Sequence, residues 1–177
     1  MDTEETKYTR VEYERRFLVS PHDDWRGLVE PYSKRFEDKY LRDTRLRLRI
    51  LTDSDTGRQL IKLNKKFDSS SPYYRTISRI LLSPGEYKLF DGMEGDRLNK
   101  TRYYHNYLGR VFSVDVFEGE LEGLVLCETE ADGFEELMKA KPPQYTKQEV
   151  TEDEYFTGGN LCRTTRAELL GKLTTFG

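Results

Sequence analysis

Apolar and polar residues alternate along several short stretches of this chain, with the period of two that is typical of half-buried strands. The stretch Glu12 to Ser20 begins as such an alternation, ends apolar and is followed by Pro21. The run Arg45 to Ile50 alternates in the same way, and the turn residues Asp53 to Gly57 connect it to Gln59–Lys66. These features predict a strand near the N-terminus and a hairpin after it.

The rest of the chain contains more strands and a few short helices. Strand patterns occur at Tyr40–Arg42, Tyr73–Leu82, Asn99–Tyr104, Val111–Phe117 and Gly123–Glu130. A short helix capped by Asp23 or Asp24 is predicted to end at Val29. Further helices are predicted at Glu86–Phe90, Phe134–Ala140 and Leu161–Leu173. Because strands dominate and no repeat or linker interrupts them, the sequence predicts one α+β domain over residues 1–177, built mainly from antiparallel strands.

Five predicted strands carry charge along one face, because residues i and i+2 of a strand point the same way. These faces are Glu12/Glu14/Arg16, Arg45/Arg47/Arg49, Lys62/Asn64/Lys66, Lys100/Arg102 and Glu128/Glu130. On a single strand such a face is usually the solvated side of a sheet. In an open sheet, five such rows would expose like charges that repel. We therefore expect a closed barrel with a polar lumen, whose apolar outer faces are covered by helices.

The charge of the chain is unevenly distributed. The net charge is only −3, but Lys34–Lys66 has eleven basic and five acidic residues, whereas Phe112–Glu154 has thirteen acidic residues and three lysines. Such a separation suits a site that holds an anion with its basic half and a cation with its acidic half.

Apolar runs and cysteines are both sparse. The longest uninterrupted apolar stretch is Leu124–Cys127, whereas a membrane-spanning helix needs about 20 apolar residues. The two cysteines, Cys127 and Cys162, have no metal-type or redox-type spacing. We therefore expect a cytoplasmic protein with no membrane-spanning segment.

Taken in order, the motifs resemble the CYTH superfamily, the triphosphate tunnel metalloenzymes. The first reads Glu12-Tyr13-Glu14-Arg15-Arg16, where the superfamily has Glu-x-Glu-x-Lys. The others, in order, are Tyr40-Leu41, Arg45 to Arg49, Lys62, Arg75, Lys100 to Tyr103, Asp115 to Gly119, Glu128 to Glu130 and Glu149 to Thr151. This resemblance spans nearly the whole chain. It implies an eight-stranded antiparallel β-barrel with peripheral helices, which binds triphosphates with a divalent metal ion.

The resemblance suggests a role for each charged face. The expected phosphate ligands are Arg45, Arg47, Arg49, Lys62, Arg75, Lys100 and Arg102. The expected ligands of Mg²⁺ or Mn²⁺ are Glu12, Glu14, Glu128 and Glu130. Glu14 or Glu130 would orient the attacking water, Arg16 would hold a terminal phosphate, and Asp115 would fix a nearby Lys or Arg. Each of these residues could instead pair with an opposite charge inside the barrel.

Two departures from the superfamily pattern affect this expectation. Arg16 stands where the superfamily commonly has Lys, and a guanidinium does not easily give or take a proton. Many members read Arg-x-Glu-x-Glu where this chain has Arg75, Ile77 and Arg79. The remaining carboxylates suffice for one octahedral metal ion and leave a second one open.

The predicted function is a metal-dependent hydrolase of inorganic triphosphate or a related triphosphate compound. Two alternatives use the same barrel: a class IV-type nucleotide cyclase, and a non-catalytic module that binds triphosphate or polyphosphate. RNA binding would need the Arg45/Arg47/Arg49 face to be exposed beside stacking aromatic residues, and the net charge of −3 argues against it. A homodimer is possible if apolar outer strand faces stay uncovered.

Overall fold

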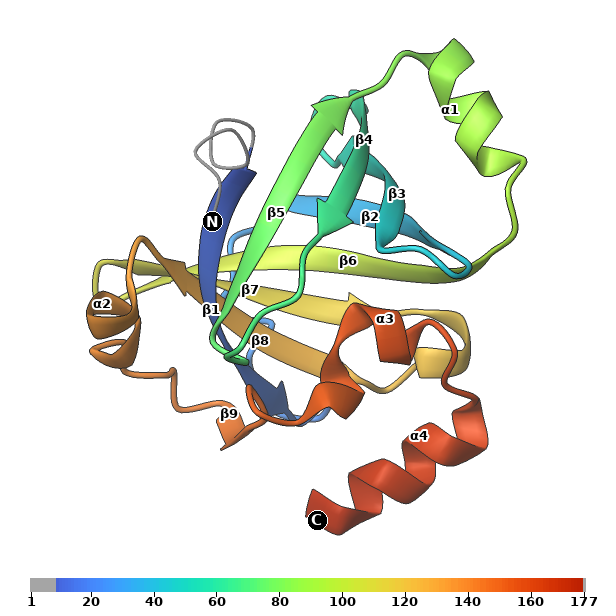
Figure 1. Cartoon of the computed structure of the whole chain (residues 1–177). Helices are drawn as coiled ribbons and strands as arrows, with labels where there is room; N and C mark the ends of the chain where they lie inside the picture. The colour runs from blue at the N-terminus through green and yellow to red at the C-terminus, as the bar shows by residue number, and fades with distance from the viewer. Residues whose placement is uncertain (1–8, 177) are drawn as a thin grey trace.

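The computed structural model describes residues 9–176, and its central feature is one large antiparallel sheet (Figure 1). Its strands are β1 (Thr9–Val19), β2 (Ser33–Leu41), β3 (Leu46–Asp53), β4 (Gln59–Lys66), β5 (Tyr74–Leu81), β6 (Gly95–Tyr107), β7 (Arg110–Phe117), β8 (Val125–Ala131) and β9 (Thr146–Glu149). They pair in the order β5-β4-β3-β2-β6-β7-β8-β1-β9.

The strand β1 closes this sheet into a barrel. Its first half, Thr9–Tyr13, pairs with β5, and its second half, Tyr13–Val19, pairs with β8. The short strand β9 adds to β1 outside this ring. The prediction of a closed eight-stranded antiparallel barrel with a few helices is confirmed.

Two tight connections set the register of neighbouring strands. Leu108 and Gly109, between β6 and β7, have φ values of 51° and 76°, which is the backbone of a two-residue hairpin turn. In the β3–β4 turn, Asp53 Oδ1 accepts hydrogen bonds from the backbone N–H groups of Asp55 and Thr56. The β3–β4 turn lies where the sequence predicts it, at Asp53 to Gly57.

The helices are short and lie outside the barrel wall. They are α1 (Pro84–Asp91), α2 (Phe134–Met138), α3 (Gly158–Leu161) and α4 (Arg166–Leu173), with 3₁₀ turns at Gly119–Leu121, Glu154–Phe156 and Thr174–Phe176. Capping boxes begin two of them: Ser83 with Glu86 at α1, and Thr165 with Glu168 at α4. Within the described part of the chain, no helix is long and apolar enough to cross a membrane.

Four details differ from the sequence prediction. The expected helix Leu161–Leu173 is divided between two helices. The helix α3 ends at Leu161, and α4 begins after its N-cap residue Thr165. The expected helix through Val29 is a series of turns that places the Trp25 side chain in the core, at 1% exposure. The strand β9 is additional, and β2 begins well before Tyr40.

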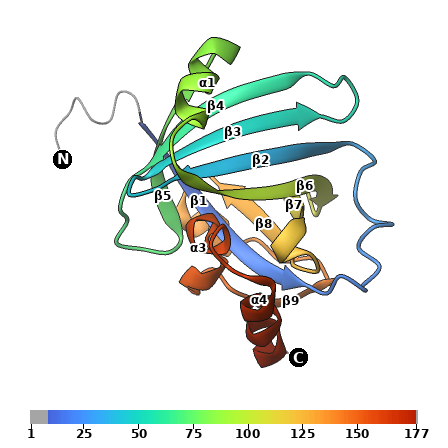
Figure 2. The same ribbon diagram turned by 90° about the vertical axis from the view of Figure 1, so that its right-hand side faces the viewer.

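Two apolar clusters pack against the barrel, one on its outer face and one at an end of it. The first covers the outer face of β7, β8 and β1, where Phe112, Val114 and Cys127 pack against Trp25 and Tyr145. The second is formed by Leu18, Leu98, Phe117, Leu121, Leu124, Leu126, Val150, Phe156, Leu161 and Leu169. Five of these residues face the inside of the barrel at the end next to α3, which lies close to α4 in Figure 2. The expected polar lumen is therefore apolar at that end.

Candidate functional site

The lumen is a cavity of about 240 Å³ into which the charged strand faces point. Its charged lining comes from most of the strands: Arg10, Glu12, Glu14, Arg16, Asp38, Arg47, Arg49, Lys62, Lys66, Arg79, Lys100, Arg102, Glu128 and Glu130. Phe36, Leu98, Phe117, Leu126 and Phe156 are among its apolar lining residues. The alternation in the sequence thus becomes a barrel with its charges inside.

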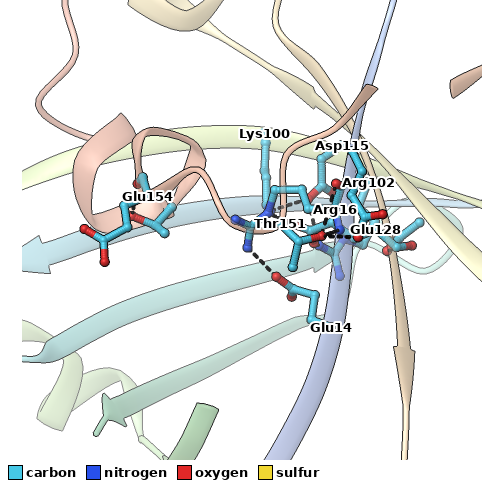
Figure 3. A network of polar contacts seen from close by, with 11 residues as sticks. Glu14, Arg16, Lys100, Arg102, Asp115, Glu128, Thr151 and Glu154 are labelled. Carbon is cyan, nitrogen blue, oxygen red and sulfur yellow. Dashed lines mark hydrogen bonds and ion pairs between the residues drawn. The ribbon is translucent and has the colours of Figure 1, made fainter. Parts of the chain in front are cut away.

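Glu128 is the centre of a network of ion pairs (Figure 3). Its carboxylate accepts hydrogen bonds from Arg16 Nε at 3.0 Å and from Arg102 Nη2 at 2.5 Å. Arg16 also forms an ion pair with Glu14. Burial alone would raise the pKa of Glu128, but Lys100, Arg102 and Arg16 hold it well below its usual range. Glu128 is therefore an anion engaged by two guanidinium groups.

Asp115 anchors the other side of this network. Its side chain is fully buried and accepts hydrogen bonds from Arg102 Nε at 2.6 Å and Arg102 Nη2 at 2.7 Å. It also forms an ion pair with Lys100. Both cations project from β6 into the lumen, so Asp115 fixes their direction.

Asp38 plays a similar part for the arginines of β3. It is 1% exposed, and Arg49 donates to it from Nε at 2.5 Å and from Nη2 at 2.6 Å. Burial opposes ionisation, but Arg49 and Arg47 lower the pKa of Asp38 to about 2. The sequence analysis did not single out Asp38. The sequence does indicate its position, because Asp38 alternates with Phe36 and Tyr40 and therefore lies on the same face of the strand.

The strand β4 supplies positive charge without acidic partners. Neither Lys62 nor Lys66 forms an ion pair within residues 9–176. Burial, and then the charge of Arg47, lowers the pKa of Lys66 to about 7. Burial and the nearby Arg79 also lower the pKa of Lys62. This wall of the lumen carries uncompensated cations, which an anionic ligand would stabilise. Lys66 was not among the predicted ligands, although its alternation with Lys62 indicated it.

The predicted metal ligands are divided between two environments. Glu128 is engaged as described, Glu14 pairs with Arg16, and Glu12 accepts from Arg79 Nη2 at 3.1 Å. Glu130, at the exposed end of β8, has no ion pair in the described part of the chain, and its pKa is raised by partial loss of hydration and by the negative charges of Glu14 and Glu12.

These carboxylates can be tested for their fit to a divalent cation. Among residues 9–176, no three His, Cys, Asp or Glu side chains are gathered as a preformed metal site. Glu14 and Glu130 are direct cross-strand partners on β1 and β8, and their mutual repulsion, together with that of Glu12, is what a cation would relieve. The set Glu12, Glu14 and Glu130 therefore fits a hard cation by its oxygen chemistry.

A larger cavity of about 520 Å³ adjoins the lumen. Both cavities are lined by Glu14, Arg16, Arg47 and Lys66. The larger one is also lined by Arg45, Arg75, the loop 67–74 and residues Thr151, Glu152, Glu154 and Thr157 to Gly159. Arg45 pairs with Asp68 there. Arg45 and Arg75 therefore lie beside this outer cavity and do not line the inner one.

A closed antiparallel barrel whose lumen holds both a cationic wall and a row of carboxylates defines a class of protein suited to a small polyanion. No protein-family model matches the chain. The chain is 30% identical over 164 residues to the inorganic triphosphatase of Nitrosomonas europaea. The aligned region covers 86% of this chain and 97% of that protein. The chain belongs to the inorganic triphosphatase family.

Solved structures agree with this assignment. The crystal structure of the inorganic triphosphatase NE1496 superposes with a TM-score of 0.56 at 26% identity, over 86% of this chain and 95% of that one. HpAC1 from Hippeastrum, described as an adenylyl cyclase candidate with a dominant triphosphatase activity, superposes with a TM-score of 0.50 at 13% identity. That match covers 72% of this chain and 82% of the other, and shows the fold alone.

Proposed function

We propose that this protein is a metal-dependent hydrolase of inorganic triphosphate or a closely related triphosphate compound. The observation that carries the proposal is the wall of uncompensated cations on β4, which faces the inside of a closed barrel of limited volume. The 30% identity to an inorganic triphosphatase over almost all of that protein supports the same reaction.

The phosphate chain is bound by the cations of the lumen. Arg47, Arg49, Lys62, Lys66, Lys100 and Arg102 are the inner ligands, and Arg45 and Arg75 receive the chain at the outer cavity. Charge-assisted hydrogen bonds from these groups neutralise the negative charge that would repel a nucleophile. Asp38 and Asp115 hold four of these cations in place, so their geometry is set before the substrate arrives.

The metal ion in this proposal is Mg²⁺ or Mn²⁺, held by Glu12, Glu14 and Glu130. When bound, it supplies Lewis-acid polarisation of a phosphoryl oxygen. Glu128 would join these ligands only if Arg16 and Arg102 gave up its carboxylate oxygens. Ile77 and Arg79 add no carboxylate on β5, which supports one metal ion and not two.

The attacking water is oriented by a carboxylate, for which Glu130 is the better of the two predicted residues. Glu14 is already paired with Arg16, whereas Glu130 has a raised pKa and no ion pair within residues 9–176. Glu130 would bind the metal ion through one carboxylate oxygen, and its other oxygen would accept the proton of the attacking water. In-line attack on a terminal phosphorus then releases phosphate and leaves pyrophosphate. Arg16, whose pKa is raised by Glu14 and Glu128 despite burial, stays a cation throughout.

The first test is phosphate release from tripolyphosphate, with Mg²⁺ or Mn²⁺ and with ATP as a parallel substrate. We expect metal-dependent release that Glu130→Gln abolishes. Glu135→Gln, which changes an exposed residue of α2, is the matched control. A cyclic nucleotide with pyrophosphate from ATP would instead establish the cyclase. Tight binding of tripolyphosphate without turnover at any metal concentration would establish a binding module.

We also propose that two copies of the chain can associate into a homodimer. Leu81 at the end of β5 and Leu89 on α1 are exposed, at 64% and 75%. Apolar side chains at such positions support association of two copies. Light scattering at several protein concentrations would decide it, and a constant monomer mass would reject it.

A further inference from the structure

Asn64, in the middle of β4, is a buried amide without a partner. It is 1% exposed, and neither its Nδ2 nor its Oδ1 has a hydrogen-bond partner among residues 9–176. Buried polar side chains are bonded in the large majority of cases, because an unmet donor or acceptor loses its hydration without compensation. An exception in the lining of a cavity indicates a group that comes from outside the chain.

The neighbours of Asn64 explain why its amide nitrogen finds no acceptor within the chain. Lys62 and Lys66 precede and follow it on the same face of β4, about 7 Å away on either side. Its cross-strand partners are Arg47 on β3 and Arg79 on β5. Lys62, Arg47 and Arg79 are cations, which donate hydrogen bonds and cannot accept one from the amide nitrogen, and the same holds for Lys66 in its protonated form.

A second unmet donor lies beside it. The Nε–H of Arg47 is also buried and has no partner in the described part of the chain. Arg47 Nη1 is 3.9 Å from Asp38 Oδ2, so this guanidinium is held in place by one edge while Nε stays free. Two donors on adjacent strands thus lack an acceptor at the same level of the barrel.

We propose that Asn64 is a substrate-contacting residue whose amide nitrogen donates to an oxygen of the inner phosphate of a linear chain, seated between Lys62 and Lys66. The nature of the ligand rests on the proposed function, whereas the need for an acceptor rests on the geometry. A neutral amide at this position adds a directional donor without adding a further positive charge to a face that already has four. It selects for a phosphate oxygen at the centre of the cationic wall.

The test compares Asn64→Leu with the wild-type protein by calorimetric binding of tripolyphosphate without metal ions, together with thermal unfolding. Leucine has a similar volume and no polar atom. We expect a dissociation constant raised about ten- to a hundredfold, as for loss of a hydrogen bond to a charged group. The unfolding temperature should stay the same or rise, since an unmet buried amide is removed. Asn106→Leu, at an exposed position of β6, is the control.

A structural role for Asn64 predicts the opposite pair of results. The unfolding temperature of Asn64→Leu would fall and the dissociation constant would stay within a factor of about three, which would overturn the proposal. Asn64→Asp keeps the shape, loses the donor and adds negative charge, so it should weaken binding at least as much as the leucine.

The same experiment separates this inference from the proposed function. Wild-type protein that binds tripolyphosphate but hydrolyses nothing would end the proposed hydrolase and leave the assignment of Asn64 supported if the leucine variant binds more weakly. Wild-type protein that hydrolyses tripolyphosphate while Asn64→Leu keeps the same dissociation constant and KM would end the assignment of Asn64 alone. Absence of any binding by the wild-type protein, both without metal ions and with Mn²⁺, would end both.

Discussion

Arg16 on β1 and Glu128 on β8 are direct cross-strand partners, and Arg16 Nε donates to Glu128 Oε1 at 3.0 Å across the seam that closes the barrel. The same carboxylate accepts from Arg102 on β6. A residue expected to hold metal therefore also joins three strands of the wall. Because its pKa is lowered, Glu128 contributes stability that is present above its ordinary pKa of 4.5 and is lost as the pH falls below it.

Glu128→Gln should therefore destabilise the protein as well as impair its activity. We expect the free energy of unfolding at pH 7 to fall by about 3 kcal/mol, which is the lower end of the range for a broken buried ion pair. The loss is limited because Arg16 is still paired with Glu14, and Arg102 with Asp115. The difference from the wild type should shrink as the pH falls below 4.5, where the Glu128 carboxylate of the unfolded chain begins to be protonated and the folded one does not. Urea unfolding at pH 7 and pH 4 measures both values. An equal difference at the two pH values would contradict the assignment.

Lys66→Met should stabilise the protein most at neutral and lower pH. The folded protein holds Lys66 at a pKa of about 7, against 10.5 when it is solvated, so the unfolded chain binds more protons between these values. Wild-type stability therefore rises with pH across this window, and the advantage of methionine should disappear towards pH 10. Thermal unfolding at pH 6, 8 and 10 follows this change. Lys65→Met, at the exposed neighbouring position, should show no such pH dependence.

Substrate binding should be coupled to proton uptake by Lys66. At pH 8 most of its amino groups are neutral in the free protein, and a phosphate chain nearby raises the pKa and favours the ammonium form. The calorimetric binding enthalpy of tripolyphosphate at pH 8 should therefore differ between two buffers with different heats of ionisation. This difference should be lost in Lys66→Met. A buffer-independent enthalpy in the wild type would exclude the coupling.

Divalent metal binding should weaken in acid because of Glu130. Its pKa lies above the ordinary 4.5 through partial loss of hydration and the charges of Glu14 and Glu12, so protons compete with a cation more strongly than at an ordinary carboxylate. We expect the dissociation constant of Mn²⁺, measured by electron paramagnetic resonance, to rise from pH 7 to pH 5. Glu130→Gln should bind at least tenfold more weakly, as expected from the loss of one carboxylate ligand, about 1.4 kcal/mol or more. An affinity that does not change with pH would count against Glu130 as a ligand.

Gly158 at the start of α3 should not tolerate a side chain. A Cβ there would overlap the Tyr40 hydroxyl and lie 2.9 Å from Tyr40 Cζ. We expect Gly158→Ala to lower the free energy of unfolding by about 1–3 kcal/mol, the usual cost of overpacking. Gly159→Ala is the neighbouring control, since a Cβ there meets nothing within 4 Å. Equal stability of the two variants would show that the Tyr40 ring moves aside freely.

The barrel could be predicted from the sequence largely because a few strands have strict alternation. Arg45 to Arg49 and Lys62 to Lys66 place like charges on one face, and only a closed sheet can turn such faces inward towards a ligand. The first half of β2 lacks this signal, because the adjacent Lys34 and Arg35 put charge on both of its faces. The split before α4 could have been read from the capping residues Thr165 and Glu168.

The pairing inside the lumen could not be predicted in the same way. The sequence names the arginines and glutamates, but whether Glu128 accepts from Arg16, Arg102 or a metal ion depends on strand register between β1, β6 and β8. The unmet amide of Asn64 likewise appears only once β3 and β5 are placed on either side of β4. The segment around Trp25 has local helical signals, but burial of the Trp25 side chain in the core determines its conformation instead.

The pairing of β1 with both β5 and β8 also has a consequence for how the protein folds. The first strand of the chain finds its second partner only after β8 has been synthesised, so closure brings together residues that are far apart in the sequence. Contacts of this kind slow folding, since loop entropy is lost before they form. Until that step, the charged interior stays open to water and both β1 and β8 present unpaired edges. During synthesis, the chain therefore passes through a stage in which an edge-to-edge encounter with another copy competes with closure.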